Sequence, residues 1–387
     1  MISELSKVPL GWEKVRFGDI AKNVTDRIDD PKTSGLKDYI GLEHLETDEI
    51  RIKRYGSPDE VEATKFLCKN GDIIFGKRRA YLRKLAVTGR DAVVSAHSMV
   101  LRPKEEKVLP EFLPWFMYSS QFWKTAFAIS EGSLSPTIKW KTLSAQEFWL
   151  PSKNEQRKIA EILWGIESNV EKLEQLIQVA EKLKKGLLEE LLTKGIGHKK
   201  FKETEIGDIP EEWELMKVGD SLSLEYGQGL PEEKREGGEY PVVGSNGIVG
   251  YHNNYTTKGP TIVVGRKGGS GQIIWVEEDC WPIDTSYFVK TKKGTNMDFA
   301  FYLLKSLNLV ELSQKGAVPG LNRKDVYEKT VGIPTPHEQV RIASLLRKTE
   351  RSENIFREHL TKIEMLKKKL TNSFLSGELS MYAEDAN

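Results

Sequence analysis

The chain has 387 residues, of which 39% are hydrophobic and 9% aromatic, and these values indicate folded domains and exclude a disordered chain. Its net charge of +1 gives no immediate reason to expect a nucleic-acid partner. Cys68 and Cys280 lie far apart without metal-ligand spacing, which excludes a disulfide scaffold and suits a reducing cytosol. The segment Met1–Trp12 is interrupted by charges and Pro9, and no uncharged apolar run approaches the roughly 20 residues that span a bilayer. We therefore expect a cytoplasmic protein.

Basic charge gathers in one stretch of the first half of the chain. Between Phe75 and Lys104 the only acidic residue is Asp91, whereas acidic residues cluster elsewhere, for instance between Glu43 and Glu49. The basic residues of this stretch are Lys77, Arg78, Arg79, Arg83, Lys84, Arg90, Arg102 and Lys104. A near-neutral protein needs such segregation to form a phosphate-binding face. The alternative is an ordinary solvated basic stretch.

The chain repeats itself, in order, over most of its length. The matched segments, first copy against second, are 12–19 with 213–220, 72–78 with 261–267, 98–101 with 286–289, 112–115 with 299–302, and 151–156 with 334–339. The offset falls steadily, from 201 residues between Trp12 and Trp213 to 183 between Pro151 and Pro334. Chance matches would not keep this order, so the sequence indicates a tandem duplication.

Each copy begins with a globular domain, residues 1–150 in the first and 198–333 in the second. Short apolar runs bounded by glycine or rich in β-branched residues predict buried strands at 72–75, 92–94, 99–101 and 261–264. Helical spacing of apolar residues predicts helices over 112–127 and 298–312. The expected fold class is α/β (mixed α+β), with each domain built around a twisted mixed sheet.

A long helix is expected after each domain, within residues 151–197 and 334–387. Each begins at a capping box. In this motif a hydroxyl accepts a hydrogen bond from the backbone N–H three positions on, and the glutamate at that position accepts one from the backbone N–H of the capping residue. The boxes are Ser152-x-x-Glu155 and Thr335-x-x-Glu338, with Pro336 at the first position of the second helix. The glycines expected to end the helices are Gly195 and Gly377.

Each long helix carries one narrow apolar stripe. Its residues are Ile159, Leu163, Ile166, Val170, Leu173, Ile177, Ala180, Leu183, Leu187 and Leu191 in the first helix, and Ile342, Leu346, Thr349, Phe356, Leu360, Ile363, Leu370 and Phe374 in the second. Alternating steps of three and four predict a coiled coil. At ~1.5 Å per residue a helix of about 40 residues spans roughly 60 Å, too long for the core of either small domain. We expect an antiparallel pair with a pseudo-two-fold axis and a domain at each end; the alternative is two helices that dock separately on an outside partner.

Catalytic motifs are missing from the sequence. No Pro-Pro pair is available for the amine-gripping motif of an adenine or cytosine methyltransferase. Gly71-x4-Gly76-Lys77 approaches a phosphate-binding P-loop, but Arg78 occupies the hydroxyl position and the residues between predict a strand. The six histidines form no zinc motif, and His97 between Ser95 and Ser98 has no orienting acid. We expect no catalytic residue, no metal and no cofactor.

Two aligned loops after the buried strands are the best candidates for contact with DNA. Glycine permits a close backbone approach, and lysine or arginine supplies phosphate charge and bidentate reading of guanine. In the second copy Asn246-Gly247 also predicts a hairpin turn between two strands. The candidate residues are Lys77, Arg78, Arg79, Tyr81, Arg83 and Lys84 in the first copy, and Ser245, Asn246, Arg266, Lys267, Ser270 and Arg323 in the second. The alternative for each loop is a solvated basic turn.

Taken in order, these segments resemble the specificity (S) subunit of type I restriction-modification systems over essentially the whole chain. The segments that carry the resemblance are Tyr39-Ile-Gly-Leu-Glu-His44, Gly76-Lys-Arg-Arg-Ala-Tyr-Leu-Arg83, Asn246-Gly-Ile-Val-Gly-Tyr251, Gly316-Ala-Val-Pro-Gly-Leu-Asn322 and the two Pro-x-x-x-Glu-Gln helix starts. The resemblance implies two target-recognition domains that each read half of a split, asymmetric site on double-stranded DNA, with the helices as a ruler between them.

The resemblance also implies partners. Two methyltransferase (M) subunits would dock near the helices and methylate adenine N6, and restriction (R) subunits would join them. The chain itself would be non-catalytic, in agreement with its lack of catalytic motifs. Two alternatives stay open: a pseudo-symmetric protein-interaction scaffold that touches no DNA, and an enzyme whose centre the sequence does not reveal.

Overall fold

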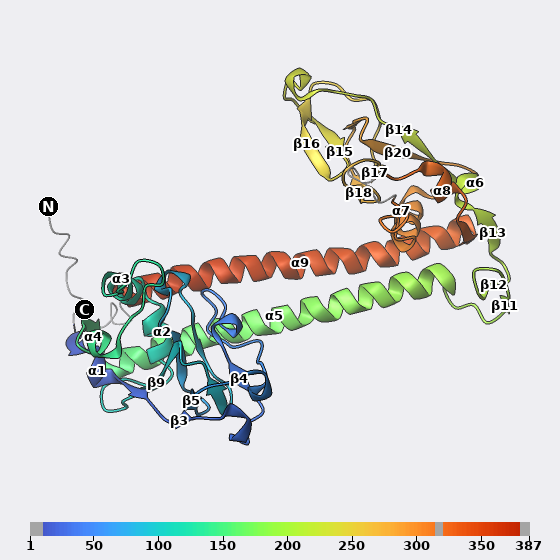
Figure 1. Ribbon diagram of the computed structural model, residues 1–387. Coiled ribbons are helices and arrows are strands. Elements are labelled where there is room, and N and C mark those ends of the chain that lie inside the picture. Colours follow the sequence, from blue (N-terminus) through green and yellow to red (C-terminus); the bar gives the residue numbers. More distant parts are fainter. Residues whose placement is uncertain (1–10, 314–319, 380–387) are drawn as a thin grey trace, which may run out of the picture. The chain divides into compact units, whose positions relative to one another are not determined.

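The computed structural model describes residues 11–313 and 320–379 (Figure 1). The segment 1–10 and positions 316–319 of the Gly316–Asn322 motif lie outside the described residues. The chain forms two compact units, the first of residues 1–173 with 359–387 and the second of residues 174–358. Each unit contains one globular domain and part of both long helices, and each is described by itself.

The globular domain of the first unit contains two four-stranded sheets. The order of the first sheet is β2 (Ala21–Val24), β9 (Ser98–Pro103), β6 (Ile73–Gly76) and β7 (Leu85–Val87), all antiparallel. The order of the second is β3 (Arg27–Ile28), β5 (Lys65–Cys68), β8 (Ala92–Val94) and β4 (Tyr39–Ile40), with β4 parallel to β8. The four residues of β6 are buried, as predicted, and their extended backbone excludes the P-loop interpretation.

A pair of strands and several short helices complete this domain. The pair is β1 (Glu13–Arg16) with β10 (Glu147–Leu150). The helices are α1 (Phe17–Ile20), α2 (Leu113–Tyr118), α3 (Ser120–Ala128), α4 (Trp140–Ser144) and the 3₁₀ turns η1 (Pro31–Thr33), η2 (Leu42–His44), η3 (Pro58–Glu60) and η4 (Ala80–Leu82). The helix predicted over 112–127 is therefore two helices. They break at Ser119, whose extended backbone and side-chain oxygen cap α3 through the N–H of Phe122.

The second unit repeats the first sheet strand for strand. Its order is β14 (Leu222–Tyr226), β20 (Ser286–Thr291), β17 (Thr261–Gly265) and β18 (Ile273–Val276), again antiparallel. A three-stranded sheet follows the order β16 (Gly247–His252), β15 (Tyr240–Gly244) and β19 (Trp281–Pro282), with β15 parallel to β19 as β4 is to β8. This correspondence confirms the tandem duplication and the mixed α/β fold.

Smaller elements complete the second unit. The strand pairs are β11 (Phe201–Lys202) with β12 (Ile209–Pro210), and β13 (Glu214–Lys217) with β21 (Thr330–Ile333). The helices are α6 (Val218–Ser221), η5 (Glu232–Lys234), α7 (Met297–Ser306) and α8 (Arg323–Tyr327). The helix predicted over 298–312 ends at Ser306, because Asn308 has a left-handed backbone (φ 46°) that stops it.

The long helices are α5 (Lys153–Thr193) and α9 (Pro336–Leu375), close to their expected bounds. At their starts, Ser152 Oγ and Thr335 Oγ1 each accept a bond of 3.4 Å from the N–H three residues on. Gly195 and Gly377 follow their C-terminal ends with positive φ, as expected of helix-stopping glycines.

In the second capping box, the prediction that Glu338 accepts a hydrogen bond from the backbone N–H of Thr335 is wrong. The carboxylate of Glu338 instead accepts from the backbone N–H of Ile196, at 2.9 Å, and from the indole N–H of Trp213, at 3.0 Å. Glu338 thus ties the start of α9 to the segment after α5. A Cβ at Gly195 would lie 2.4 Å from this carboxylate, so glycine is required there for a second reason.

The predicted seam is right at its apolar positions except Leu183. The side chain of Leu183 is 53% exposed, and Lys184 takes the inward position instead. With Lys184 included, α5 keeps an unbroken alternation of three and four residues from Ile159 to Leu191. Glu353 and Lys367 complete the alternation of α9 in the same way.

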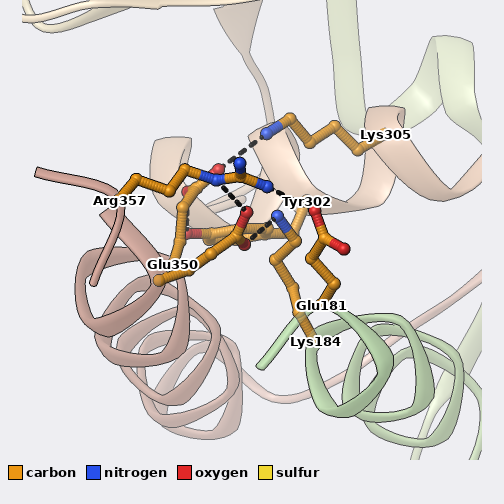
Figure 2. A network of polar contacts seen from close by, with 7 residues as sticks. Glu181, Lys184, Tyr302, Lys305, Glu350 and Arg357 are labelled. Atoms are coloured by element: carbon orange, nitrogen blue, oxygen red, sulfur yellow. Dashed lines mark hydrogen bonds and ion pairs between the residues drawn. The ribbon is translucent and has the colours of Figure 1, made fainter. Parts of the chain in front are cut away.

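Ion pairs join the two helices within each unit, in antiparallel order. In the first unit Lys367 Nζ lies 2.9 Å from Glu167 Oε2. In the second, Lys184 Nζ lies 2.5 Å from Glu353 Oε2, within the cluster that Figure 2 shows. Lys184 and Lys367 are 183 positions apart, which is the offset of the duplication at these helices. Within each unit, the helices therefore pair as an antiparallel coiled coil.

Candidate nucleic-acid interface

Two arginines of the second unit stack on one tyrosine. The guanidinium carbon of Arg266, which follows β17, lies 5.2 Å from the ring centre of Tyr226, and that of Arg323 lies 4.6 Å from the same ring. Tyr226 ends β14 and is 52% exposed. The structure therefore brings two predicted residues together on an aromatic side chain that the prediction missed, an arrangement that holds cations in place at a surface.

Hydrogen bonds to the backbone fix both arginines. Arg266 Nε donates to the carbonyl oxygen of Asp284 at 3.0 Å, and Arg323 Nη1 donates to that of Leu224 at 3.0 Å. Each guanidinium uses one of its five N–H groups in this bond, so several remain for a phosphate or a base edge. The pair is positioned before any ligand arrives.

The predicted hairpin lies directly against the Arg266 loop. Gly244 pairs with Gly247, so the two turn residues are Ser245 and Asn246, one position earlier than the predicted Asn246-Gly247 pair. A Cβ at Gly269 would lie only 1.7 Å from Asn246 Oδ1. The glycine therefore makes room for the asparagine amide, and the turn and the loop form one continuous surface.

Two predicted hydroxyls serve to hold this surface together. Ser245 is buried, and its Oγ lies within hydrogen-bond distance of the carbonyl oxygens of Lys267 and Thr285, 2.6 Å from the latter. Ser270 is also buried and contacts the hydroxyl of Ser313. We therefore place these serines among the residues that position the loop, while Asn246 and Lys267 are exposed.

In the first unit the loop after β6 forms a compact basic group. Arg78 is exposed, and its Nη1 lies 3.4 Å from Nε2 of His97, which belongs to the turn between β8 and β9. Burial lowers the pKa of His97, and the charges of Arg78, Lys77 and Lys65 lower it further. The imidazole is therefore neutral at pH 7 and able both to donate and to accept a hydrogen bond.

Lys77 faces the same group. Its Nζ lies 5.7 Å from the ring centre of Phe66, and burial, followed by the charges of Arg78 and Arg27, lowers its pKa. Cations this close together repel one another, and bound phosphate would relieve the repulsion. This is the electrostatic property expected of an anion-binding face.

The remaining predicted residues of this loop divide into two sets. Arg79 and Tyr81 are exposed, Tyr81 by 59%. Arg83 instead forms an ion pair with Asp48 at 2.7 Å, and Lys84 Nζ donates to the carbonyl oxygen of Leu42 at 2.6 Å. Both are half-buried, so we place them among the residues that anchor the loop.

The two units build this surface from equivalent parts. In each, the loop after the central strand (β6 or β17) lies against the turn that leads into β9 or β20. The sequence singled out His97 in the first of these turns but passed over Asp284 in the second. Tyr226 had no counterpart to mark it, because β2 ends at Val24, one position short of the place equivalent to Tyr226.

Over the described residues, no group of three or more His, Cys, Asp or Glu side chains could hold a metal ion. Across these same residues, none of the helices combines the length and the apolar character needed to cross a membrane.

Comparison with known proteins identifies the family. The family described as "Type I restriction modification DNA specificity domain" matches residues 9–182 and again 210–365. The type I restriction enzyme MjaVIII specificity subunit of Methanocaldococcus jannaschii is 25% identical, over 96% of this chain and 94% of that protein. The EcoprrI specificity subunit of Escherichia coli is 29% identical over 40% of this chain and 39% of that protein.

A solved structure shares the fold. The crystal structure of the S subunit of a type I restriction-modification system from M. genitalium superimposes with a TM-score of 0.66 at 15% identity, covering 96% of this chain and 98% of that one. The two family matches coincide with the two copies of the duplication. The chain therefore belongs to the type I restriction-modification DNA specificity family, whose members are non-catalytic recognition subunits.

Proposed function

We propose that this chain reads a bipartite, asymmetric site on double-stranded DNA, one half with each globular domain. The observation that carries the proposal is that one sheet frame presents two unlike loops from the same place. Lys77, Arg78 and Arg79 leave β6 in the first unit, whereas Arg266, Lys267 and Gly268 leave β17 in the second. Like frames with unlike loops are what two different half-sites require.

The chemistry of each surface supports this role. Lysine and arginine contribute affinity through phosphate contacts and counterion release, which carry no sequence information. Sequence choice needs side chains whose positions are fixed before base edges reach them, and hydrogen bonds to the backbone fix Arg266 and Arg323 in this way. The exposed amide of Asn246 suits adenine, and the guanidinium groups suit guanine.

The long helices would set the distance between the half-sites. α5 is a continuous helix of 41 residues, which at ~1.5 Å per residue spans roughly 60 Å. Charged residues at seam positions fix the register of a coiled coil, because a shifted register would leave a half-buried charge unpaired. Lys184, Glu353 and Lys367 meet this requirement.

As a family member, the chain would act in the cytoplasm with methyltransferase subunits, and with restriction subunits where the system has them. We propose two methyltransferase subunits, because a duplicated chain offers equivalent surfaces twice. Leu183 and Leu366 are 183 positions apart, and their side chains are 53% and 48% exposed. An apolar side chain repeated at an exposed, equivalent position is suited to one partner type that binds twice.

Methylome mapping tests the proposal. The chain is expressed with its cognate methyltransferase in a host that lacks other DNA methylation, and modified adenines are located by long-read sequencing. We expect one split motif with two unlike halves and a fixed spacer. A complex that methylates without such a motif, or whose S subunit is not retained on DNA-cellulose at low salt, would favour the scaffold instead.

A further inference from the structure

We propose that Asp284 is a specificity-determining residue of the second domain and accepts a hydrogen bond from the exocyclic amino group of a cytosine or an adenine. The inference rests on the proposed DNA-reading function and adds to it the class of base that this domain requires. Nothing in the sequence marks Asp284, because an acidic residue is not expected on a face that binds phosphates.

The position of Asp284 places it within the candidate interface. It lies in the turn between β19 and β20, and its backbone oxygen accepts the bond from Arg266 Nε. The next residue, Thr285, accepts from the backbone N–H groups of Arg266 and Lys267 at 2.9 and 3.1 Å. The turn of Asp284 and the basic loop are therefore locked together, and a duplex that reaches one reaches the other.

Within the described residues, the carboxylate of Asp284 has no hydrogen-bond or ion-pair partner. It is exposed, and no hydrogen bond or ion pair engages it, although Arg266 and Lys267 are its neighbours. Arg266 instead stacks on Tyr226.

The electrostatic effect of the Asp284 carboxylate on DNA binding indicates a role in specificity. A carboxylate on this face opposes phosphate binding, so its presence weakens affinity for every sequence alike. A base edge compensates for this cost only where it offers a hydrogen donor. In the major groove these donors are N4 of cytosine and N6 of adenine, and acidic side chains accept from such groups.

The first copy has a different residue at the position equivalent to Asp284, and this difference supports the assignment. Because Ser98 matches Ser286, the position equivalent to Asp284 is Ala96, followed by His97 where the second copy has Thr285. Alanine neither repels phosphate nor accepts a hydrogen bond. The requirement for an amino group is therefore specific to the half-site that the second domain reads.

Three variants of the assembled complex with its methyltransferase test the proposal. Asp284→Ala removes the charge and the acceptor, and Asp284→Asn removes the charge but keeps an acceptor oxygen. Glu278→Ala is the matched control, since Glu278 is also an exposed acid but lies beyond β18, at the opposite end of β17 from Arg266. Binding is measured to the mapped site, to duplexes with each single base pair of the second half-site changed, and to an unrelated duplex.

We expect wild type to bind about 5-fold or more weakly when, at one pair of the second half-site, the cytosine or adenine on the contacted strand is replaced by guanine or thymine, the range of a single base contact. Asp284→Ala should lose this discrimination at that pair alone and bind the unrelated duplex at least as tightly as wild type. Asp284→Asn should keep part of the discrimination, and Glu278→Ala all of it.

Other results would overturn the assignment. If Asp284→Ala and Asp284→Asn raise affinity for all duplexes by one factor and discriminate as wild type does, the carboxylate acts only through its field. Unchanged binding by both variants would also contradict the assignment of Asp284. A wild-type complex that distinguishes none of the duplexes would instead contradict the proposed DNA-reading function, and the two failures are thereby separable.

Discussion

Lys184 Nζ lies 2.5 Å from Glu353 Oε2, and both residues occupy seam positions of the paired helices in the second unit. Arg357 also contacts Glu353, with Nε 3.1 Å from Oε1, and reaches Glu181 of α5 (Figure 2). One turn before Glu353, Glu350 accepts from Tyr302 and Lys305 of α7, each at 3.0 Å. The pairing of the helices and the attachment of the domain thus share one polar cluster.

Removal of the Glu353 charge should destabilise the second unit. Its side chain is only 7% exposed and that of Lys184 36%, so Glu353→Gln leaves a half-buried ammonium without its counter-charge. We expect a loss of about 1–3 kcal/mol in the free energy of unfolding, measured by denaturant titration. Replacing both partners, as Lys184→Met with Glu353→Leu, should restore most of it. Glu358→Gln, at an exposed position of the same helix, is the control.

The same contribution should depend on pH. Burial raises the pKa of Glu353, but the hydrogen bonds and charges of Lys184 and Arg357 outweigh it and hold the pKa below its ordinary value of 4.5. A lowered pKa in the folded state stabilises the protein above the unfolded pKa, and this stabilisation is lost as the pH falls through the folded pKa. The stability difference between wild type and Glu353→Gln should therefore be full at pH 7 and shrink below about pH 4.5. A difference that grows on acidification would contradict this account.

The seam shows what the sequence could and could not predict. Apolar periodicity found both helices and most inward positions, because burial of the stripe dominates their stability. It missed Lys184, Glu353 and Lys367, since a search for apolar residues passes over charged ones that are buried against each other. It selected Leu183 because this residue is apolar, although its side chain is exposed.

The interface could be predicted in part for similar reasons. Aligned basic loops located Arg78 and Arg266, because duplication repeats the place of a loop even where its residues change. Tyr226 and Asp284 come to the surface from other strands and turns, and only the folded sheet brings them beside Arg266. Ser245 is polar in the sequence, but its position after a buried strand turns it inward.

Removal of the leading arginine of each unit should weaken binding of the assembled complex to its site. We expect Arg78→Ala and Arg266→Ala each to cost roughly 1–3 kcal/mol if a base contact is lost, or to lower the salt slope by about one unit if a phosphate contact is lost. Gel-shift titration over a range of salt concentrations distinguishes these outcomes. The controls are Arg90→Ala and Lys258→Ala, at exposed positions beyond the opposite ends of β6 and β17. Unchanged binding by both arginine variants would remove these loops as the readers.

Gly269→Ala should disturb the hairpin tip without unfolding the domain. The added methyl group would overlap the exposed amide of Asn246, which must rotate away, and would lie 3.0 Å from the carbonyl oxygen of Ser245, which crowds the turn. We expect destabilisation of about 1–3 kcal/mol, typical of overpacking, together with weaker binding to the cognate site. Asn246→Ala combined with Gly269→Ala should recover the stability, because the clashing amide is gone. A double variant as unstable as Gly269→Ala would place the strain in the backbone.

The ruler is tested by a change in helix length. Four residues added between Ile166 and Leu183 lengthen α5 by about one turn, or ~6 Å, and displace the charged seam positions along the helix. Methylome mapping should then find the same two half-sites separated by a different spacer, because the loops that read them are unchanged.

A control at constant length separates the effect of distance from that of surface composition. Lys172, Gln175, Gln178 and Lys182 are all exposed on the same stretch of α5, and their joint replacement by alanine alters the surface without altering the length. This variant should keep the original spacer. If the insertion also keeps it, the helices do not measure the distance between half-sites, since a rigid connection cannot change its length and leave the reading heads equally far apart.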